Sequence, residues 1–410
     1  MRPEESANGF CDSASKGAFM ADDFALLTVQ AYSEKALLTD RTGGATSLNI
    51  PLLGLFGEIG SLLSEVKKKQ RDAIAYRAYA SGVVEELGDV LWYLSVLAAR
   101  RGLALAEVVA NIGNTSGDWR SPTDLDVTFA ELQPPILSPS DGPTAVFEAT
   151  LLKLAASVGL LLADQSGEGL ADDRESLGRH LADIFEQLIV AANEAGVTLE
   201  AAAIKNQTKI FDRWPQNRVY PALLDDTAPS EEQLPRSLAI EISEREVAGK
   251  LYVHQTCNGL NIGDRLTDNA MAPDDYRYHD VFHYAYVAVL GWSPVTRRLF
   301  RLKRKSDPKI DEAEDGARAI LIEEGITTWI FGQAVEMDFY AGLNAGDLPL
   351  DLLKQIRQFV SGYEAEQCPA WLWEDAILQG YAAFRFLREH RRGRIILNAD
   401  DRQLHIEPFS

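Results

Sequence analysis

Acidic side chains recur at helical spacing in the first hundred residues of this 410-residue chain. Glu58 and Glu65 are seven residues apart, which places them about 20° apart on one helix face at 100° per residue. Glu86 and Asp89 follow one turn apart in the next helical stretch. Carboxylates among apolar residues are costly to bury unless they are paired or bind a metal, and a set of oxygen ligands suits Mg²⁺. The alternative is that these residues are ordinary solvated helix faces.

A second set of candidate metal ligands lies in the C-terminal half. His279 and His283 are four residues apart, so a helix places both on one face. Acidic residues that accompany them are Asp280, Glu323 and Glu324. Imidazoles with carboxylates favour a transition metal such as Zn²⁺, Fe or Mn²⁺ over Mg²⁺. Two structural histidines that bind no metal are the alternative.

His254 extends this second set because it lies 25 residues before His279. The order His254, then His279-Asp280, weakly resembles the H…HD…D layout of HD-type phosphohydrolases. No clear final aspartate completes that layout, although Asp311 and Asp315 are available. We therefore count His254 among the candidate ligands of the second site.

The segments that must position these residues are all predicted to be helical. Helical periodicity runs from about residue 22 to 109 and from about 146 to 211, and proline-rich breaks follow each stretch. We expect an all-α protein, with at most a short C-terminal hairpin around residues 398–401. Its expected parts are a flexible N-terminus (1–20), a first carboxylate-bearing unit (21–118), a linker (119–145), a degenerate second unit (146–216), a second linker (217–235) and a helical C-terminal domain (236–410).

The first two helical stretches look like a tandem repeat. The string Glu86-Leu-Gly-Asp89 recurs as His180-Leu-Ala-Asp183, 94 residues later. Each unit would bury its apolar face against its twin in a pseudo-dimer.

Composition and charge exclude several classes of protein. The chain has 40 Lys and Arg against 61 Asp and Glu, a formal net charge of −21, which disfavours nucleic acid as a partner. No apolar run approaches the ~20 residues of a membrane span, so we expect no membrane partner. Three scattered cysteines predict a reducing, cytoplasmic location. The basic run over 297–305 is either a solvated helix end or a connector that meets phosphate.

Two strings in the first unit resemble a known family. Residues 57–68 read GEIGSLLSEVKK and residues 85–94 read EELGDVLWYL. They resemble the MazG-type, all-α nucleoside triphosphate pyrophosphohydrolases, which are related to the dimeric dUTPases. That family carries ExxE on one helix and ExxD on the next, followed by Asn, Lys and Arg residues that reach the phosphates. The resemblance is close over residues 32–105 and weaker over the second repeat.

The resemblance implies roles for single residues. Glu58, Glu86 and Asp89 match metal ligands, and the second acid of ExxE is Ser61 here. Either Glu65 replaces that acid or three carboxylates hold the ion. The basic pair Lys67 and Lys68 and the aromatic Trp92 match substrate-binding positions. The catalytic candidates are Glu58, Glu85 and Glu86, because one glutamate must accept a proton from water.

The second repeat contributes a basic tail. Asn206, Lys209 and Arg213 match the family's phosphate-contacting Asn-x-x-Lys-x-x-x-Arg string, whereas the acids of the first repeat are missing. We therefore expect one composite site, with metal ligands from the first repeat and a phosphate clamp from the second. Two decayed copies are the alternative.

The implied function is metal-dependent hydrolysis of a (deoxy)nucleoside triphosphate to the monophosphate and pyrophosphate, for cleansing or depletion of nucleotide pools. Mg²⁺ is the expected cofactor, with Mn²⁺ as its substitute and a transition metal in the C-terminal domain. One alternative is a nucleotide-sensing regulatory protein with weak catalysis. Another is a phosphohydrolase whose activity resides in the histidine-bearing domain. Base preference and homo-oligomerisation stay open.

Overall fold

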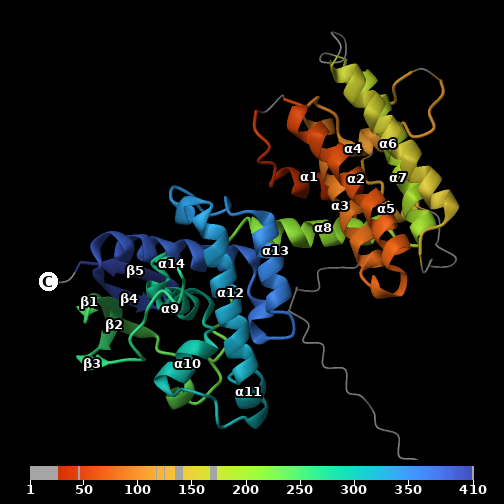
Figure 1. The fold of residues 1–410 in the computed structure, drawn as a ribbon. Coiled ribbons are helices and arrows are strands. Elements are labelled where there is room, and N and C mark those ends of the chain that lie inside the picture. The colour runs from red at the N-terminus through yellow and green to blue at the C-terminus, as the bar shows by residue number, and fades with distance from the viewer. Residues whose placement is uncertain are drawn as a thin grey trace, which may run out of the picture. The chain divides into compact units, whose positions relative to one another are not determined.

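The computed structural model describes residues 26–44, 47–116, 118–123, 125–133, 142–166 and 173–408. The expected flexible N-terminus, residues 1–20, lies outside them. The chain divides into two compact units, with the boundary between Gln207 and Thr208. Figure 1 shows that the first unit is built from helices and that the second combines helices with a sheet.

The first unit contains two pairs of long helices. Helix α2 packs along α3 and α6 along α7, and the pairs meet through α2 with α6 and α3 with α7 (Figure 1). Leucines such as Leu55, Leu87, Leu154 and Leu181 are fully buried between them. The helices are α1 (Val29–Leu37), α2 (Asn49–Asp72), α3 (Tyr79–Ala99), α4 (Leu105–Val109), α5 (Phe129–Leu132), α6 (Ala145–Ser166), α7 (Arg174–Ala195) and the part of α8 (Leu199–Arg213) that precedes Thr208.

The spacing of these helices supports the expected repeat. Helix α6 begins 96 residues after α2, α7 begins 95 residues after α3, and α8 begins 94 residues after α4. Both helix pairs belong to one compact unit. The tandem arrangement is therefore a proposal that rests on the strings and on the helix spacing.

Part of the expected first linker is an ordered element of the first unit. Thr128 caps α5 through a reciprocal capping box with Glu131. Phe129 is buried, and its ring lies edge-on to Tyr32, with 5.8 Å between ring centroids. This segment thus helps to hold α1 against the bundle.

Helix α6 is long and apolar enough to cross a membrane by length and composition alone. The qualifying stretch, Ala145–Asp164, has a mean hydropathy of 1.8. Glu148 and Lys153 interrupt the apolar run, so the sequence pattern alone predicts no membrane span here. Mostly buried core helices of soluble proteins pass the same test, whereas 33% of this stretch is buried, where α6 packs along α2 and α7. The absence of a membrane partner stays a prediction.

The second unit overturns the expected all-α fold. It contains a five-stranded antiparallel sheet in the order β3-β2-β1-β4-β5, so the protein has a mixed α/β fold rather than a helical C-terminal domain. The strands are β1 (Ser237–Val247), β2 (Lys250–Cys257), β3 (Leu260–Asn261), β4 (Arg392–Asn398) and β5 (Gln403–Glu407).

The sequence of the central hairpin explains this sheet. Ile240 and Ile242 alternate with more exposed polar residues along β1, which is the two-residue period of a half-buried strand. Ala248 and Gly249 both have positive φ, 54° and 76°, as a tight two-residue hairpin turn requires. This alternation is short and the segments around it have a helical pattern, so the prediction of a helical domain was wrong. The expected C-terminal hairpin is confirmed, because β4 pairs with β5.

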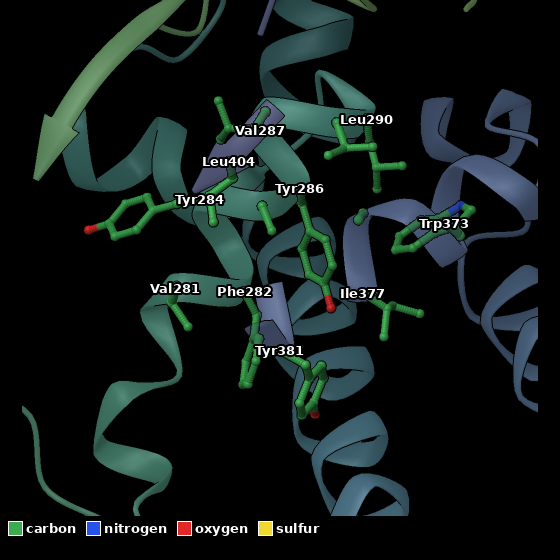
Figure 2. Packing of buried hydrophobic residues seen from close by; sticks show 14 of the residues in the cluster. Val281, Phe282, Tyr284, Tyr286, Val287, Leu290, Trp373, Ile377, Tyr381 and Leu404 are labelled. Carbon is green, nitrogen blue, oxygen red and sulfur yellow. The ribbon is translucent and has the colours of Figure 1, made fainter. Parts of the chain in front are cut away.

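The helices of the second unit enclose an aromatic core. In Figure 2, α9 and the π-helical turn η4 lie against α14, with Phe282 beside Tyr381 at 4.4 Å between ring centroids. Tyr286 meets Trp373 at 5.5 Å in the same layer. The helices are α9 (Asp280–Ala285), η4 (Tyr286–Leu290), α10 (Pro294–Phe300), α11 (Pro308–Ala313), α12 (Ala317–Val335), α13 (Leu350–Phe359) and α14 (Ala370–His390).

Two residues of the basic run over 297–305 belong to a buried ion-pair network. Arg297 is buried and lies 2.6 Å from Asp225, and Arg304 is buried 2.7 Å from Asp315. Arg298, Arg301 and Lys305 are exposed, as a solvated helix end predicts, and the connector to phosphate stays a prediction. Asp225 belongs to the expected second linker (217–235), so that segment is also integral to the second unit.

Candidate functional site

Three carboxylates from α2 and α3 converge in the first unit. Glu58 on α2 and Glu86 and Asp89 on α3 each offer an oxygen, and these oxygens all lie within 4.8 Å of one another. Glu86 and Asp89 share a helix face because they are one turn apart. All three side chains are half-buried. The structure thus brings together three of the four predicted metal ligands.

The electrostatics of this carboxylate site favour a cation. Burial raises the pKa of Glu86, and the adjoining Glu58, Asp89 and Glu85 raise it further, to about 8. Carboxylates at such short separations cannot all remain charged without a proton or a cation among them. A set of half-buried oxygen donors suits Mg²⁺, which keeps several waters in its shell, and also suits Mn²⁺.

Asn206 on α8 holds one of these carboxylates in place. Its Nδ2 donates to Oδ1 of Asp89 at 2.8 Å, and the Tyr32 hydroxyl donates to its Oδ1 at 2.9 Å. Gly88 permits this contact, since a Cβ there would lie 2.5 Å from the carbonyl oxygen of Ala202 on α8. Asn206 was predicted to contact phosphate, but it contacts a candidate metal ligand. Tyr32 was not predicted, because a buried tyrosine has no signature in spacing.

Glu65 lies outside the carboxylate site. It shares a helix face with Glu58, but seven residues separate them by about 10 Å along the axis. Its carboxylate accepts from Lys68 at 2.7 Å and from the Tyr76 hydroxyl. It also lies against Gly82, where a Cβ would clash with its Oε2. Glu65 and Lys68 therefore connect α2 to the start of α3.

The other predicted residues of the first unit occupy varied positions. The indole N–H of Trp92 donates to the carbonyl oxygen of Ala36 and to the Thr39 hydroxyl, so this ring is a packing element. Lys67 is exposed. Glu85 lies outside the carboxylate site, with Nζ of Lys205 at 3.9 Å. Lys205 was not predicted, although it immediately precedes Asn206.

The predicted basic tail is divided between the two units. Asn206 belongs to the first unit, whereas Lys209 and Arg213 belong to the second. The Arg213 guanidinium donates to the carbonyl oxygens of Leu348 at 2.6 Å and Gly346 at 3.4 Å. The Arg213 guanidinium therefore binds backbone carbonyl groups of the second unit.

The second helix pair has no equivalent carboxylate site among the described residues. His180, at the position of Glu86, lies 3.1 Å from Asp164. Asp183, at the position of Asp89, is exposed. Helix α6, the counterpart of α2, has no acidic residue between Glu148 and Asp164. Among the described residues, the second helix pair therefore lacks both the acids and the carboxylate site.

A second cluster lies in the other unit. His279, His283 and Glu324 each offer one ligand atom, and these atoms lie within 4.8 Å of one another. The histidines flank the first turn of α9, and Glu324 projects from α12. Burial and the neighbouring His283 lower the pKa of His279 against the opposing effect of Asp280. Burial opposes charge on His283 too, but Glu323 and Glu324 raise its pKa to about 10.

His254 does not join this cluster. On β2, Gln255 is the residue directed at α9, since it donates to Asp280 and accepts from Tyr284. Neighbouring side chains on a strand point to opposite faces, so His254 points away from α9. The two aspartates considered for the H…HD…D layout form salt bridges instead, Asp311 with Lys305 and Asp315 with Arg304. The structure does not assemble that layout from these residues.

Comparisons with known proteins bear on the second unit. Residues 219–410 match the family model described as MazG C-terminal domain. No curated protein and no solved structure matches the chain. The matched region begins inside the segment expected as a second linker and includes the sheet and the histidine cluster. This match supports membership of a MazG-like family, in agreement with the resemblance of the carboxylate strings.

Proposed function

We propose that the first unit hydrolyses a nucleoside triphosphate to its monophosphate and pyrophosphate, with a divalent cation at Glu58, Glu86 and Asp89. The observation that carries this proposal is the convergence of three carboxylates from two helices. The hydrogen bond from Asn206 to Asp89 supports it, since metal ligands need orienting partners. The match to the MazG C-terminal domain supports a nucleotide-related role.

Some residues of the site would bind the cation and the substrate, and another would accept a proton. When bound, Mg²⁺ neutralises phosphate charge and lowers the pKa of a coordinated water. Attack of water on the α-phosphorus breaks its bond to the bridging oxygen, and pyrophosphate leaves with that oxygen. Glu58 or Glu85 accepts the proton of the attacking water. Lys205, beside Glu85, contributes positive charge to a chain whose net charge of −21 would otherwise repel the substrate.

Ser61 favours a second candidate function. The family pattern has an acid at this position, and its absence leaves three carboxylates for the cation. A weaker metal site can still bind a nucleotide with its cation while it turns the substrate over slowly. This is the nucleotide-sensing alternative.

Product analysis tests the proposal. The full chain is stripped of metal, given Mg²⁺ alone, and incubated with a panel of ribo-, deoxyribo- and modified nucleoside triphosphates. We expect monophosphate and pyrophosphate, with activity lost in Glu86→Gln and retained in Glu186→Gln, which changes an exposed glutamate on α7.

Two results would contradict it. Inorganic phosphate or nucleoside that persists in Glu86→Gln would place the chemistry elsewhere in the chain. Nucleotide binding without any product, across the panel, would favour the sensing function.

A further inference from the structure

We propose that His279, His283 and Glu324 form a transition-metal site whose remaining coordination positions are open to solvent, with Glu323 as the residue that orients His283. This site lies in the second unit and is independent of the proposed function of the first. Two imidazoles and one carboxylate are a donor set that suits Fe²⁺, Mn²⁺ or Zn²⁺ better than Mg²⁺.

The first observation is an unsatisfied nitrogen. His283 is 1% exposed, and its Nε2 has no hydrogen-bond partner. This nitrogen faces Oε2 of Glu324 at 3.6 Å. Two ligands that bind one ion at about 2.1 Å each stand about 3–3.5 Å apart, so little movement would close the site. A buried polar atom without a partner is costly, and a metal ion would satisfy it.

The second observation is that both imidazoles are oriented. Nδ1 of His279 contacts the carbonyl oxygen of Tyr276 at 2.9 Å, and Nδ1 of His283 contacts Oε1 of Glu323 at 2.8 Å. Hydrogen bonds at Nδ1 direct each Nε2 away from these partners, so Nε2 is the nitrogen that can bind a metal. Nε2 of His279 also lies 3.3 Å from Oδ1 of Asp280, which the metal would share or displace. The Tyr276 ring also stacks on His279, with 4.4 Å between centroids and 3° between planes.

Glu323 is the best-anchored part of this arrangement. It is fully buried, and it accepts from the Ser293 hydroxyl and from the backbone N–H of Val295, both at 2.7 Å. Its oxygens are therefore committed to Ser293, Val295 and His283. A carboxylate behind a metal-binding histidine fixes the ring and raises its basicity. Glu323 is thus a positioning residue, which refines its predicted role as a ligand.

Access distinguishes this site from a closed structural one. The Glu324 side chain is 41% exposed, whereas that of His283 is 1% exposed. The cluster therefore has a buried wall and an open side. Three protein ligands with an open position are typical of catalytic metal sites, which keep water or substrate in the remaining positions.

The competing explanation for this cluster is that His283 carries a proton and that no metal ion is bound. An imidazolium at His283, between Glu323 and Glu324, would also balance the charge. The two explanations differ in what they predict for metal content, and they can be separated directly.

Metal analysis of the full chain tests the proposal. The protein is produced without a polyhistidine tag, stripped, and titrated with Zn²⁺, Mn²⁺ or anaerobic Fe²⁺ in excess Mg²⁺, which occupies the carboxylate site. We expect about one tightly held transition-metal ion per chain, and with Co²⁺ an absorption spectrum of imidazole ligation. His279→Ala and His283→Ala should each lose this ion, and Glu323→Gln should bind it about 10–100-fold more weakly.

Matched controls separate the site from the fold. His390→Ala and Glu336→Gln change an exposed histidine and an exposed glutamate of the same unit and should keep the ion. Thermal unfolding shows whether each variant is folded. Glu86→Gln should lose triphosphate hydrolysis and retain the transition metal, which separates failure of this proposal from failure of the proposed function. Wild-type protein that holds no transition metal, or folded His283→Ala protein that still holds it, would overturn the proposal.

Discussion

The two helix pairs of the first unit have the same spacing but different chemistry. On α2 and α3, Glu58, Glu86 and Asp89 offer oxygens within 4.8 Å of one another. On α6 and α7, His180 pairs with Asp164, and no acidic residue lies between Glu148 and Asp164. The second pair nevertheless packs against the first and leads into α8.

This difference teaches that a helix pair without a carboxylate site can still support the site of its neighbour. Asn206, on the helix that follows the second pair, donates to Asp89 of the first. Its side chain is buried and also accepts from Tyr32. The orienting partner of the carboxylate site therefore comes from the part of the sequence that has no carboxylate site. The phosphate clamp that we predicted from the second repeat stays a prediction.

The largest expected effect contrasts equivalent aspartates. Asp89→Asn removes a proposed metal ligand, and we expect kcat/KM for triphosphate hydrolysis to fall by about 100-fold or more, since even orienting partners are worth 10–100-fold. Asp183→Asn, 94 residues later and exposed, should stay within about twofold of wild type. Steady-state kinetics with Mg²⁺ measure both. Equal losses would mean that the second helix pair also contributes to catalysis.

A smaller effect should follow when the hydrogen bond from Tyr32 to Asn206 is removed. Tyr32→Phe leaves Oδ1 of Asn206 without its donor, so we expect a fall in kcat of about tenfold and a loss of about 1–3 kcal/mol in unfolding free energy. Tyr79→Phe is the matched control, because the buried Tyr79 hydroxyl has no hydrogen-bond partner. Steady-state kinetics measure kcat, and denaturant unfolding measures the free energy of unfolding. Equal kcat in both variants would show that Tyr32 does not orient the site.

The smallest expected effect is a gain in stability. Without metal, Glu86→Gln removes repulsion among the carboxylates, and we expect a gain of about 1 kcal/mol at pH 9, an amount reduced by solvent screening. His180→Gln breaks a half-exposed pair and should change the stability by less than about 0.5 kcal/mol. Denaturant unfolding in a chelator measures both changes.

The pH dependence of this gain has a definite sign. The pKa of Glu86 in the folded chain, about 8, exceeds the ordinary value of 4.5. Its contribution to stability is therefore fully present below about pH 4.5 and is lost as the pH rises through 8. The advantage of Glu86→Gln over metal-free wild type should grow over that range. A constant advantage would mean that Glu86 does not titrate in this way.

Much of the candidate chemistry could be predicted from local spacing. The one-turn separation of Glu86 and Asp89 and that of His279 and His283 both follow from helix geometry alone. Glu65 shows the limit of this reasoning, because sharing a helix face with Glu58 does not bring it within reach of the same ion. The strands were missed for a different reason, since the two-residue alternation around Ile240 was outweighed by the helical pattern of the rest of the chain.

The sequence by itself determined the long helices, the acidic strings, the spacing of the two histidines and the loss of acids from the second repeat, because each depends on neighbours within a few residues. Tertiary structure decided which of these groups meet. It joined Glu58 to Glu86, Asn206 to Asp89, and His283 to the adjacent glutamates of α12. Such contacts depend on how helices pack, and packing is set by long-range burial that no local pattern records.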